Sequence, residues 1–124
     1  MKKIYTQDAP TAIGPYSQAV VSGGLVYLSG QIPIVPETGM LAGASIEAQV
    51  EQVCKNIEAV LVASGSGISK VVKTTCFLRH LSDFGTFNAV YERHFIGKPA
   101  RSCVEISALP KGALVEIEAV AELG

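Results

Sequence analysis

The alternation of residue types over residues 114–122 constrains the fold more than any other feature of this sequence. In a β-strand, successive side chains point to opposite faces of the sheet. One face of this segment is wholly apolar, with Val115, Ile117, Ala119 and Ala121. The other face is mixed, with Leu114, Glu116, Glu118, Val120 and Glu122. We therefore expect an antiparallel sheet in which helices cover the apolar face. The mixed face is then left for contacts other than the core.

Two segments have the apolar spacing of helices that could cover this sheet. Apolar residues recur at helical spacing from Ile46 to Leu61, after Ser45 as a candidate N-cap. The run Ser64-Gly65-Ser66-Gly67 then ends the helix. The second helix is capped by Ser82 or Asp83. Its apolar stripe, which we assign to the core, consists of Phe84, Phe87, Tyr91 and Phe95.

Six other segments are predicted as strands, which gives the order β-β-α-β-α-β-β after a short first strand. These segments are residues 2–6, 16–21, 25–31, 68–78, 99–105 and 114–122. In the third of them we expect Leu25, Tyr27, Ser29 and Gln31 to share a face. The pattern is typical of a single α+β domain over residues 1–124. Because the mixed sheet face is too apolar for a solvated surface, we expect it to pack against other copies of the chain.

Composition excludes several classes of function. The 124 residues carry a net charge of −1 and no run of Lys or Arg, which argues against a nucleic-acid binder that works through phosphate contacts. The three cysteines and two histidines have no metal-binding spacing, and no cofactor motif is present. We therefore expect neither a metal nor a cofactor. An odd cysteine count without a signal sequence fits a cytoplasmic protein, and no apolar run is long enough to span a membrane.

Arg101 is the first candidate for chemistry. Arg101, Cys103 and Glu105 alternate along the strand over residues 99–105, and we place them on the same sheet face as Glu116 and Glu118. One interpretation is an ion pair of Arg101 with Glu105 or Glu118, which the spacing alone favours. The other is a clamp on a small substrate carboxylate, because a guanidinium is a bidentate donor suited to it. The residues alone leave both open.

Cys103 and Glu116 are weaker candidates. A cysteine in such a strand is commonly a small buried residue, and neither His80 nor His94, both assigned to the surface, is placed to activate it as a nucleophile. A positioning role fits Cys103 better. Glu116 and Glu118 form either a solvated pair or, at an interface, a general acid or base that holds a water. Hydroxyl groups from Tyr16 and Ser29 complete a possible small-molecule cleft.

Four motifs together resemble the reactive intermediate deaminase A family, also called YjgF or the liver perchloric acid-soluble protein family. The resemblance runs from about Thr6 to Ala121. The motifs are Ile13-Gly14-Pro15-Tyr16-Ser17-Gln18, Ser29-Gly30-Gln31-Ile32-Pro33, Pro99-Ala100-Arg101-Ser102-Cys103-Val104-Glu105 and Leu109-Pro110-Lys111. One segment departs from the family. Only Ile96-Gly97-Lys98 precedes Pro99, where the family has a longer loop with an aromatic residue, and Lys98 occupies the aromatic position.

The resemblance implies a chorismate-mutase-like fold, with two helices on one face of a mixed sheet, assembled as a homotrimer with substrate clefts between subunits. It implies hydrolysis of reactive enamines and imines, such as 2-aminoacrylate and 2-aminocrotonate, to 2-ketoacids and ammonia. Pyridoxal-phosphate dehydratases release such intermediates. By the resemblance, Arg101 clamps the substrate carboxylate and Cys103 and Glu116 contact or position the attacking water. Cleft-lining positions in the family correspond to Tyr16, Ser29, Gly30 and Asn88.

Two other functions remain open from the sequence. Family members have been described as endoribonucleases or translation inhibitors, although the charge of this chain argues against RNA. A trimer that binds small carboxylates without turnover is the third possibility.

Overall fold

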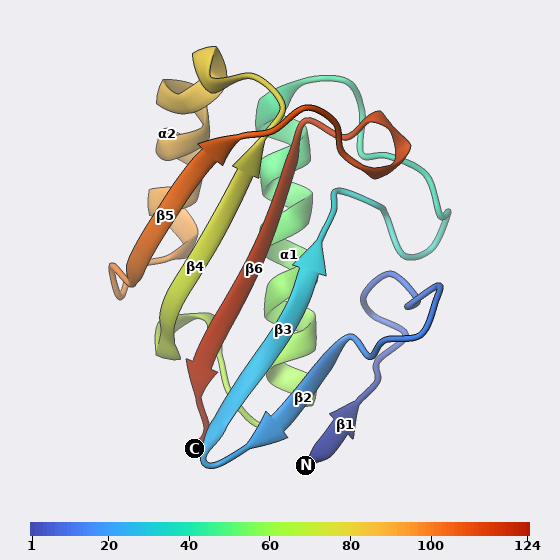
Figure 1. Cartoon of the computed structure of the whole chain (residues 1–124), viewed down its shortest axis with the longest axis vertical. Coiled ribbons are helices and arrows are strands. Elements are labelled where there is room, and N and C mark those ends of the chain that lie inside the picture. The colour runs from blue at the N-terminus through green and yellow to red at the C-terminus, as the bar shows by residue number, and fades with distance from the viewer.

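The computed structural model describes all 124 residues, and its elements follow the predicted order. Figure 1 shows one sheet with two helices behind it. The helices are α1 (Ile46–Ala63) and α2 (Phe84–His94). The strands are β1 (Lys2–Ile4), β2 (Ala19–Ser22), β3 (Leu25–Gln31), β4 (Val71–Leu78), β5 (Ala100–Glu105) and β6 (Val115–Glu122). Short 3-10 turns precede β4, α2 and β6 at Ile68–Lys70, Leu81–Asp83 and Pro110–Gly112.

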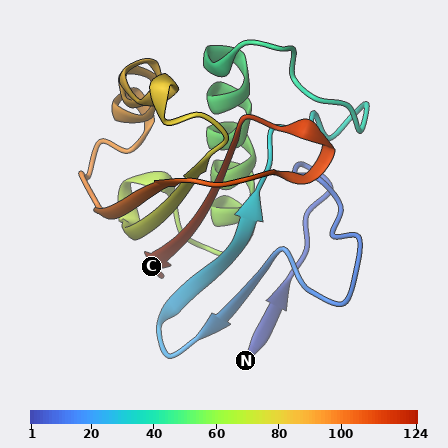
Figure 2. The ribbon, with the colours of Figure 1, turned by 45° about the horizontal axis from the view of Figure 1, so that its top comes forward.

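The six strands lie in the order β1-β2-β3-β6-β4-β5. Only β4 and β5 are parallel neighbours, and every other pair is antiparallel. β3 and β4 flank β6 and run the same way, joined by α1, while α2 joins β4 to β5. Both connections move in the same direction across the sheet, and such crossovers are nearly always right-handed. Both helices must therefore cover the same face, and the predicted chorismate-mutase-like α+β fold is confirmed (Figures 1 and 2).

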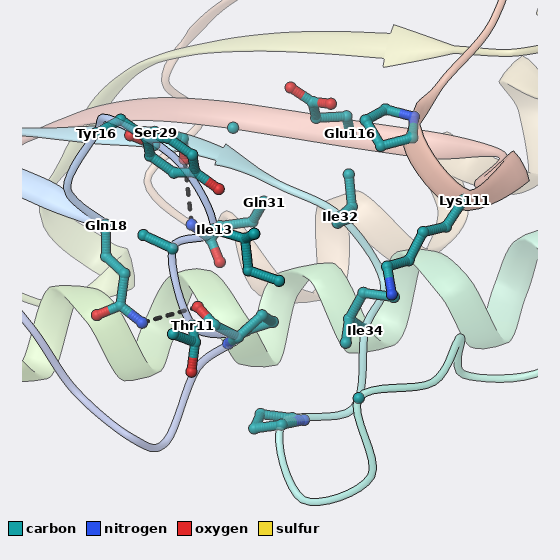
Figure 3. A pocket seen from close by; sticks show the side chains of 16 residues that line it. Thr11, Ile13, Tyr16, Gln18, Ser29, Gln31, Ile32, Ile34, Lys111 and Glu116 are labelled. Atoms are coloured by element: carbon teal, nitrogen blue, oxygen red, sulfur yellow. Dashed lines mark hydrogen bonds between the residues drawn. The ribbon is translucent and has the colours of Figure 1, made fainter.

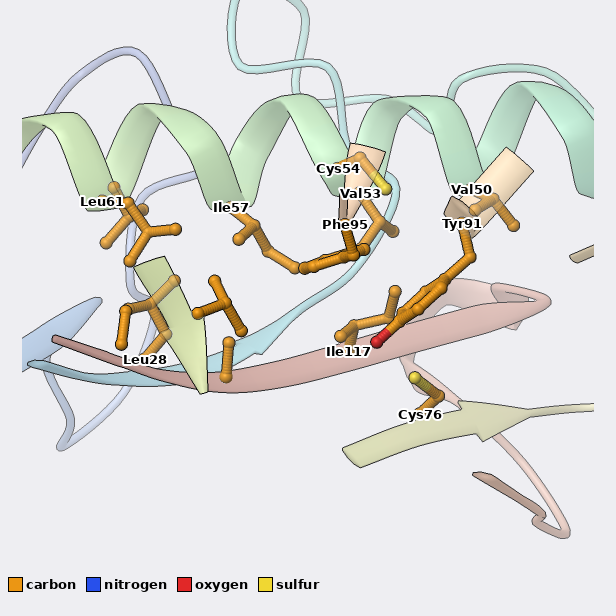
Figure 4. Packing of buried hydrophobic residues seen from close by; sticks show 14 of the residues in the cluster. Leu28, Val50, Val53, Cys54, Ile57, Leu61, Cys76, Tyr91, Phe95 and Ile117 are labelled. Carbon is orange, nitrogen blue, oxygen red and sulfur yellow. The ribbon is translucent and has the colours of Figure 1, made fainter. Parts of the chain in front are cut away.

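The core lies between this sheet face and the two helices. At the start of α1, the Oγ of Ser45 accepts a hydrogen bond from the backbone N of Ala48 at 3.1 Å, as the N-cap prediction requires. Figure 4 shows apolar side chains of α1 directed at the sheet. The predicted apolar face of β6 lies beneath them, and its residues, all at most 3% exposed, are Val115, Ile117, Ala119 and Ala121.

Strand pairing corrects the predicted position of Arg101 and Cys103. Arg101 pairs with Thr74 and Cys103 pairs with Cys76, and both partners are fully buried under the helices. Arg101 and Cys103 therefore point to the helix side of the sheet. Glu116 and Glu118 pair with residues 77 and 75 and point to the opposite face. The prediction placed Arg101, Cys103 and Glu105 on the face of Glu116 and Glu118, and it was wrong, because a relative shift of one residue between strands reverses the facing of every side chain.

A β-bulge corrects a second prediction, the facing of Gln31. Leu28 pairs with Ala119 and Gln31 pairs with Ile117, so β3 uses one residue more than β6 across this interval. The extra residue turns Gln31 to the side of Leu28, where it is buried, and away from Leu25 and Tyr27. The bulge falls at Ser29-Gly30, beside the candidate site.

The sheet face away from the helices exposes several apolar side chains. Tyr27, Val72 and Val104 are 43%, 39% and 45% exposed there. Lys73, Glu118 and Glu122 add charges to the same strands. Neither of the two helices is both long enough and apolar enough to cross a membrane.

Candidate functional site

The Arg101 guanidinium is held by α2 without a carboxylate partner. Its Nη1 donates to the Oδ1 of Asn88 at 2.7 Å. The guanidinium also lies 5.4, 5.8 and 4.9 Å from the ring centres of Phe84, Phe87 and Tyr91, within the range of cation–π attraction. Phe84 is 37% exposed and so belongs to this contact more than to the core, contrary to its core assignment.

The alternative interpretation of Arg101, an ion pair with Glu105 or Glu118, was wrong. The two ion pairs in the structure both involve Glu51, which pairs with Arg93 and His94. His94 is therefore not the plain surface residue that we expected. Glu105 accepts instead from the backbone N of Leu81 at 2.7 Å. Arg101 thus keeps donors free for an external anion.

Cys103 lies beside Arg101 on the helix side of the sheet and is half-buried. Burial raises the pKa of its thiol, and the positive charge of Arg101 opposes this only in part. Burial likewise raises the pKa of its neighbour Cys76 to about 12. Thiols with raised pKa values are poor nucleophiles at neutral pH, in keeping with a positioning role for Cys103.

A large open cavity lies at the end of the sheet where β3 ends and β6 begins (Figure 3). Its volume is about 830 Å³. Residues from the loop before β2, the bulge of β3, the loop after it and the turn before β6 line the wall. The lining residues are Pro10, Thr11, Ala12, Ile13, Tyr16, Gln18, Ser29, Gly30, Gln31, Ile32, Ile34, Pro36, Gly39, Pro110, Lys111 and Glu116.

Glu116 lies against the backbone of Gly30 in this cavity. A Cβ at position 30 would overlap the Glu116 carboxylate, so a larger residue there would force this side chain to move. Burial raises the pKa of the Glu116 carboxyl, and the negative charge of Glu118 adds to the effect. A carboxyl with a raised pKa is suited to exchange a proton near neutral pH.

Ser29 and Tyr16 line the same cavity as this carboxyl. The Oγ of Ser29 donates to the carbonyl oxygen of Ser17 at 2.6 Å, which leaves its lone pairs to accept from a ligand. The Tyr16 side chain is 54% exposed. Both side chains border the cavity in Figure 3.

The predicted site residues therefore form two separate groups within one chain. Tyr16, Ser29, Gly30 and Glu116 line the large cavity. Asn88 and Arg101 line a second cavity of about 490 Å³, together with Tyr91, Glu92, Phe95, Lys98 and Pro99. Cys103 lines neither cavity. One group offers a carboxyl and hydroxyls, and the other offers an anion clamp. No group of three or more His, Cys, Asp or Glu side chains is placed to hold a metal.

Sequence reasoning missed several residues around the large cavity. Gln18, Gln31 and Lys111 line it, and Gln49 and Asn56 of α1 hold its walls from behind. Gln49 and Asn56 interrupt an otherwise apolar helix face at a spacing of seven residues, which was the available signal.

The fold and the two polar groups define a class, an α+β domain of chorismate-mutase-like architecture with two separate groups of candidate site residues. The family described as Endoribonuclease L-PSP matches residues 6–123, and the chain belongs to this family, which includes the reactive intermediate deaminase A proteins. The resemblance read from the four motifs is thereby confirmed.

Similar proteins carry different functional names. A "putative regulator AldR" from Lactococcus lactis is 52% identical, covering 99% of this chain and 98% of its own. The 2-iminobutanoate/2-iminopropanoate deaminase of Salmonella typhimurium is 48% identical, covering 97% and 96%. The crystal structure of Escherichia coli TdcF with bound serine matches with a TM-score of 0.95 and 42% identity over 100% of both chains.

Proposed function

We propose that this protein hydrolyses reactive 2-imino acids, and the enamines from which they form, to 2-ketoacids and ammonia. The observation that carries the proposal is Arg101, a guanidinium held by Asn88 and three aromatic rings with no carboxylate to neutralise it. Such a group is a ready clamp for a substrate carboxylate. The name of the Salmonella relative, a deaminase of two 2-imino acids, supports this choice of substrate.

The reaction needs a water, an anchor and a proton acceptor. The imine reacts in its protonated form, the iminium. Glu116 takes a proton from a bound water as the oxygen bonds to the iminium carbon and the C=N electron pair moves to nitrogen, which gives a neutral adduct with a hydroxyl and an amine. Glu116 returns this proton to the amine, and it then takes the hydroxyl proton as the C=O bond forms and the C–N bond breaks. The products are a 2-ketoacid and ammonia, so one water is consumed for each imine. An imine carbon is already electrophilic, so positioning and proton transfer suffice.

The two groups of residues must come from different copies of the chain. Arg101 and Glu116 point to opposite faces of one sheet, so a single chain does not present them to the same small molecule. We propose a homotrimer in which Arg101, Asn88 and Cys103 of one subunit meet Tyr16, Ser29, Gly30 and Glu116 of the next. The exposed apolar residues on the outer sheet face favour such an assembly.

A coupled assay tests the function. A pyridoxal-phosphate dehydratase generates the imine from serine or threonine, and its decay is followed with and without this protein after subtraction of the uncatalysed rate. We expect Arg101→Ala to lower kcat/KM about a hundredfold and Arg101→Lys about tenfold, because lysine keeps the charge but loses the bidentate fork. No acceleration by the wild type would refute the deaminase.

The description of the family as an endoribonuclease makes RNA the other candidate substrate. The net charge of −1 and the absence of a basic run weigh against it. Incubation of the wild type and Arg101→Ala with a labelled RNA decides the point. Cleavage by both proteins, without imine hydrolysis by the wild type, would support the nuclease.

Tight binding of 2-ketobutyrate with neither activity would support a carboxylate-binding protein.

A further inference from the structure

Two buried amide side chains on α1, Gln49 and Asn56, hold the walls of the large cavity from behind, but the proposed reaction gives them no part. They are 2% and 1% exposed. Seven residues make about two helical turns, so both lie on the same face of α1. An amide buried without hydrogen bonds is strongly destabilising. The hydrogen-bond partners of these two amides therefore explain how they are accommodated in the interior.

Asn56 is bonded to the loop that follows the β3 bulge. Its Nδ2 donates to the carbonyl oxygens of Ile32 at 3.1 Å and Ile34 at 3.0 Å. Its Oδ1 accepts from the Nε2 of Gln52 at 2.9 Å. Ile32 and Ile34 line the large cavity two and four residues after Gly30. Asn56 thus fixes the chain just beyond Gly30.

Gln49 is bonded to the segment that leads into β6. Its Oε1 accepts from the backbone N of Leu114 at 2.8 Å, and its Nε2 donates to the carbonyl oxygen of Gly43 at 3.0 Å. Leu114 lies two residues before Glu116. Gln49 thus fixes the chain just before the candidate acid/base.

We propose that Gln49 and Asn56 are positioning residues that together hold the Glu116 carboxylate over Gly30 at the geometry that proton transfer requires. The inference rests on the proposed function of Glu116. Asn56 anchors the Gly30 side of this contact and Gln49 anchors the Glu116 side. The contact leaves no room for a Cβ, so a small shift of either strand end alters it. Neither amide lines the cavity, so both act through the backbone.

The test compares Gln49→Met with Val60→Ala. Methionine has a volume close to that of glutamine but makes neither hydrogen bond. Val60 is fully buried nearer the far end of α1, so its truncation lowers stability without contact to the cavity. We expect Gln49→Met to lower kcat about tenfold with KM changed less than twofold, because the acid/base is displaced and not the carboxylate clamp. Val60→Ala should leave both constants near wild type.

A second readout follows the Glu116 carboxyl directly, by NMR titration of its carboxyl carbon. Glu118 on the same strand and Lys111 in the turn before it are the other charged groups at this position, and both variants retain them. We expect the pKa of Glu116 to fall toward its ordinary value in Gln49→Met, because a displaced carboxyl is better hydrated. It should stay raised in Val60→Ala.

Gln49→Glu serves as the conservative rescue, because burial keeps its carboxyl protonated, so that one oxygen accepts from the N–H of Leu114 and the O–H donates to the carbonyl oxygen of Gly43. This variant should fold and recover most of the wild-type kcat. It still tests the role of Gln49 if Gln49→Met does not fold. Equal losses of kcat in Gln49→Met and Val60→Ala, with an unchanged pKa of Glu116, would overturn the positioning role. So would a Gln49→Glu variant that folds but stays as slow as Gln49→Met. If the wild type has no imine hydrolysis, the proposed function fails, while the NMR comparison still tests whether Gln49 positions Glu116.

Discussion

Gly30 and Glu116 are the pair of residues on which the cavity geometry depends most closely. The structure predicts that Gly30→Ala forces the Glu116 carboxylate aside, with a marked loss of kcat and a smaller loss of stability, because only the far end of a flexible side chain has to move. Gly85 in α2 is the matched control, since a Cβ there meets no atom within 4 Å. Gly85→Ala should stabilise the protein by roughly 0.4–1 kcal/mol. Thermal unfolding and the coupled assay measure both effects, and a fully active, stable Gly30→Ala would contradict the geometry.

The raised pKa of Glu116 makes stability depend on pH in a predictable direction. The folded protein holds this proton more tightly than the unfolded chain, whose carboxyl titrates near 4.5. The contribution of Glu116 to stability is therefore greatest below that pH and is lost as pH rises through the folded-state pKa. Glu116→Gln should raise the unfolding temperature at pH 8, change it little at pH 4, and abolish hydrolysis. A lower unfolding temperature at pH 8 would show that the ionised carboxylate is stabilising.

The candidate residues themselves could be identified from the sequence, because Arg101, Ser29 and Gly30 fall in short motifs and Glu116 lies on the mixed face of the strand over residues 114–122. The contacts that surround these side chains could not be identified from the sequence. The aromatic rings around Arg101 come from α2, and the ion pair that spacing favoured was wrong because Glu105 bonds a distant backbone N–H. Such contacts depend on tertiary packing, which neighbouring residues in the chain do not encode.

At the scale of elements, α1 is the part whose boundaries local sequence determines best. Ser45 caps its N-terminus as predicted, and the glycine-containing run after Ala63 ends it. Ser45→Ala should lower the free energy of unfolding by about 1 kcal/mol and leave hydrolysis unchanged, because the cap does not line the cavity. Urea unfolding measures the change, and an unaltered midpoint would contradict the capping role.

For the strands, by contrast, local sequence does not determine which face of the sheet each side chain occupies. The alternation within each strand was predicted correctly for β6, but the facing of β5 relative to β6 was not. That facing depends on the register of β5 against β4 and of β4 against β6, which is set by contacts between residues distant in sequence. The bulge in β3 is a further feature of pairing, and it alone turned Gln31 to the helix side.

At the scale of the whole molecule, the two sheet faces have different roles. The helix-covered face forms the core, while the outer face exposes apolar side chains such as Tyr27 and Val104 between charged ones. This distribution favours burial of the outer face between subunits. Because the clamp and the acid/base point to opposite faces of one sheet, assembly and catalysis are linked in our proposal.

Mixing two inactive variants tests this link most directly. Arg101→Ala lacks the clamp and Glu116→Gln lacks the acid/base. If each site combines Arg101 of one subunit with Glu116 of the next, equal amounts of both variants, unfolded and refolded together, should recover about a quarter of the wild-type activity. This fraction follows because half of the subunits supply an intact clamp and half of their neighbours an intact carboxylate. Co-assembled trimers with no more activity than the separate variants would contradict the shared site.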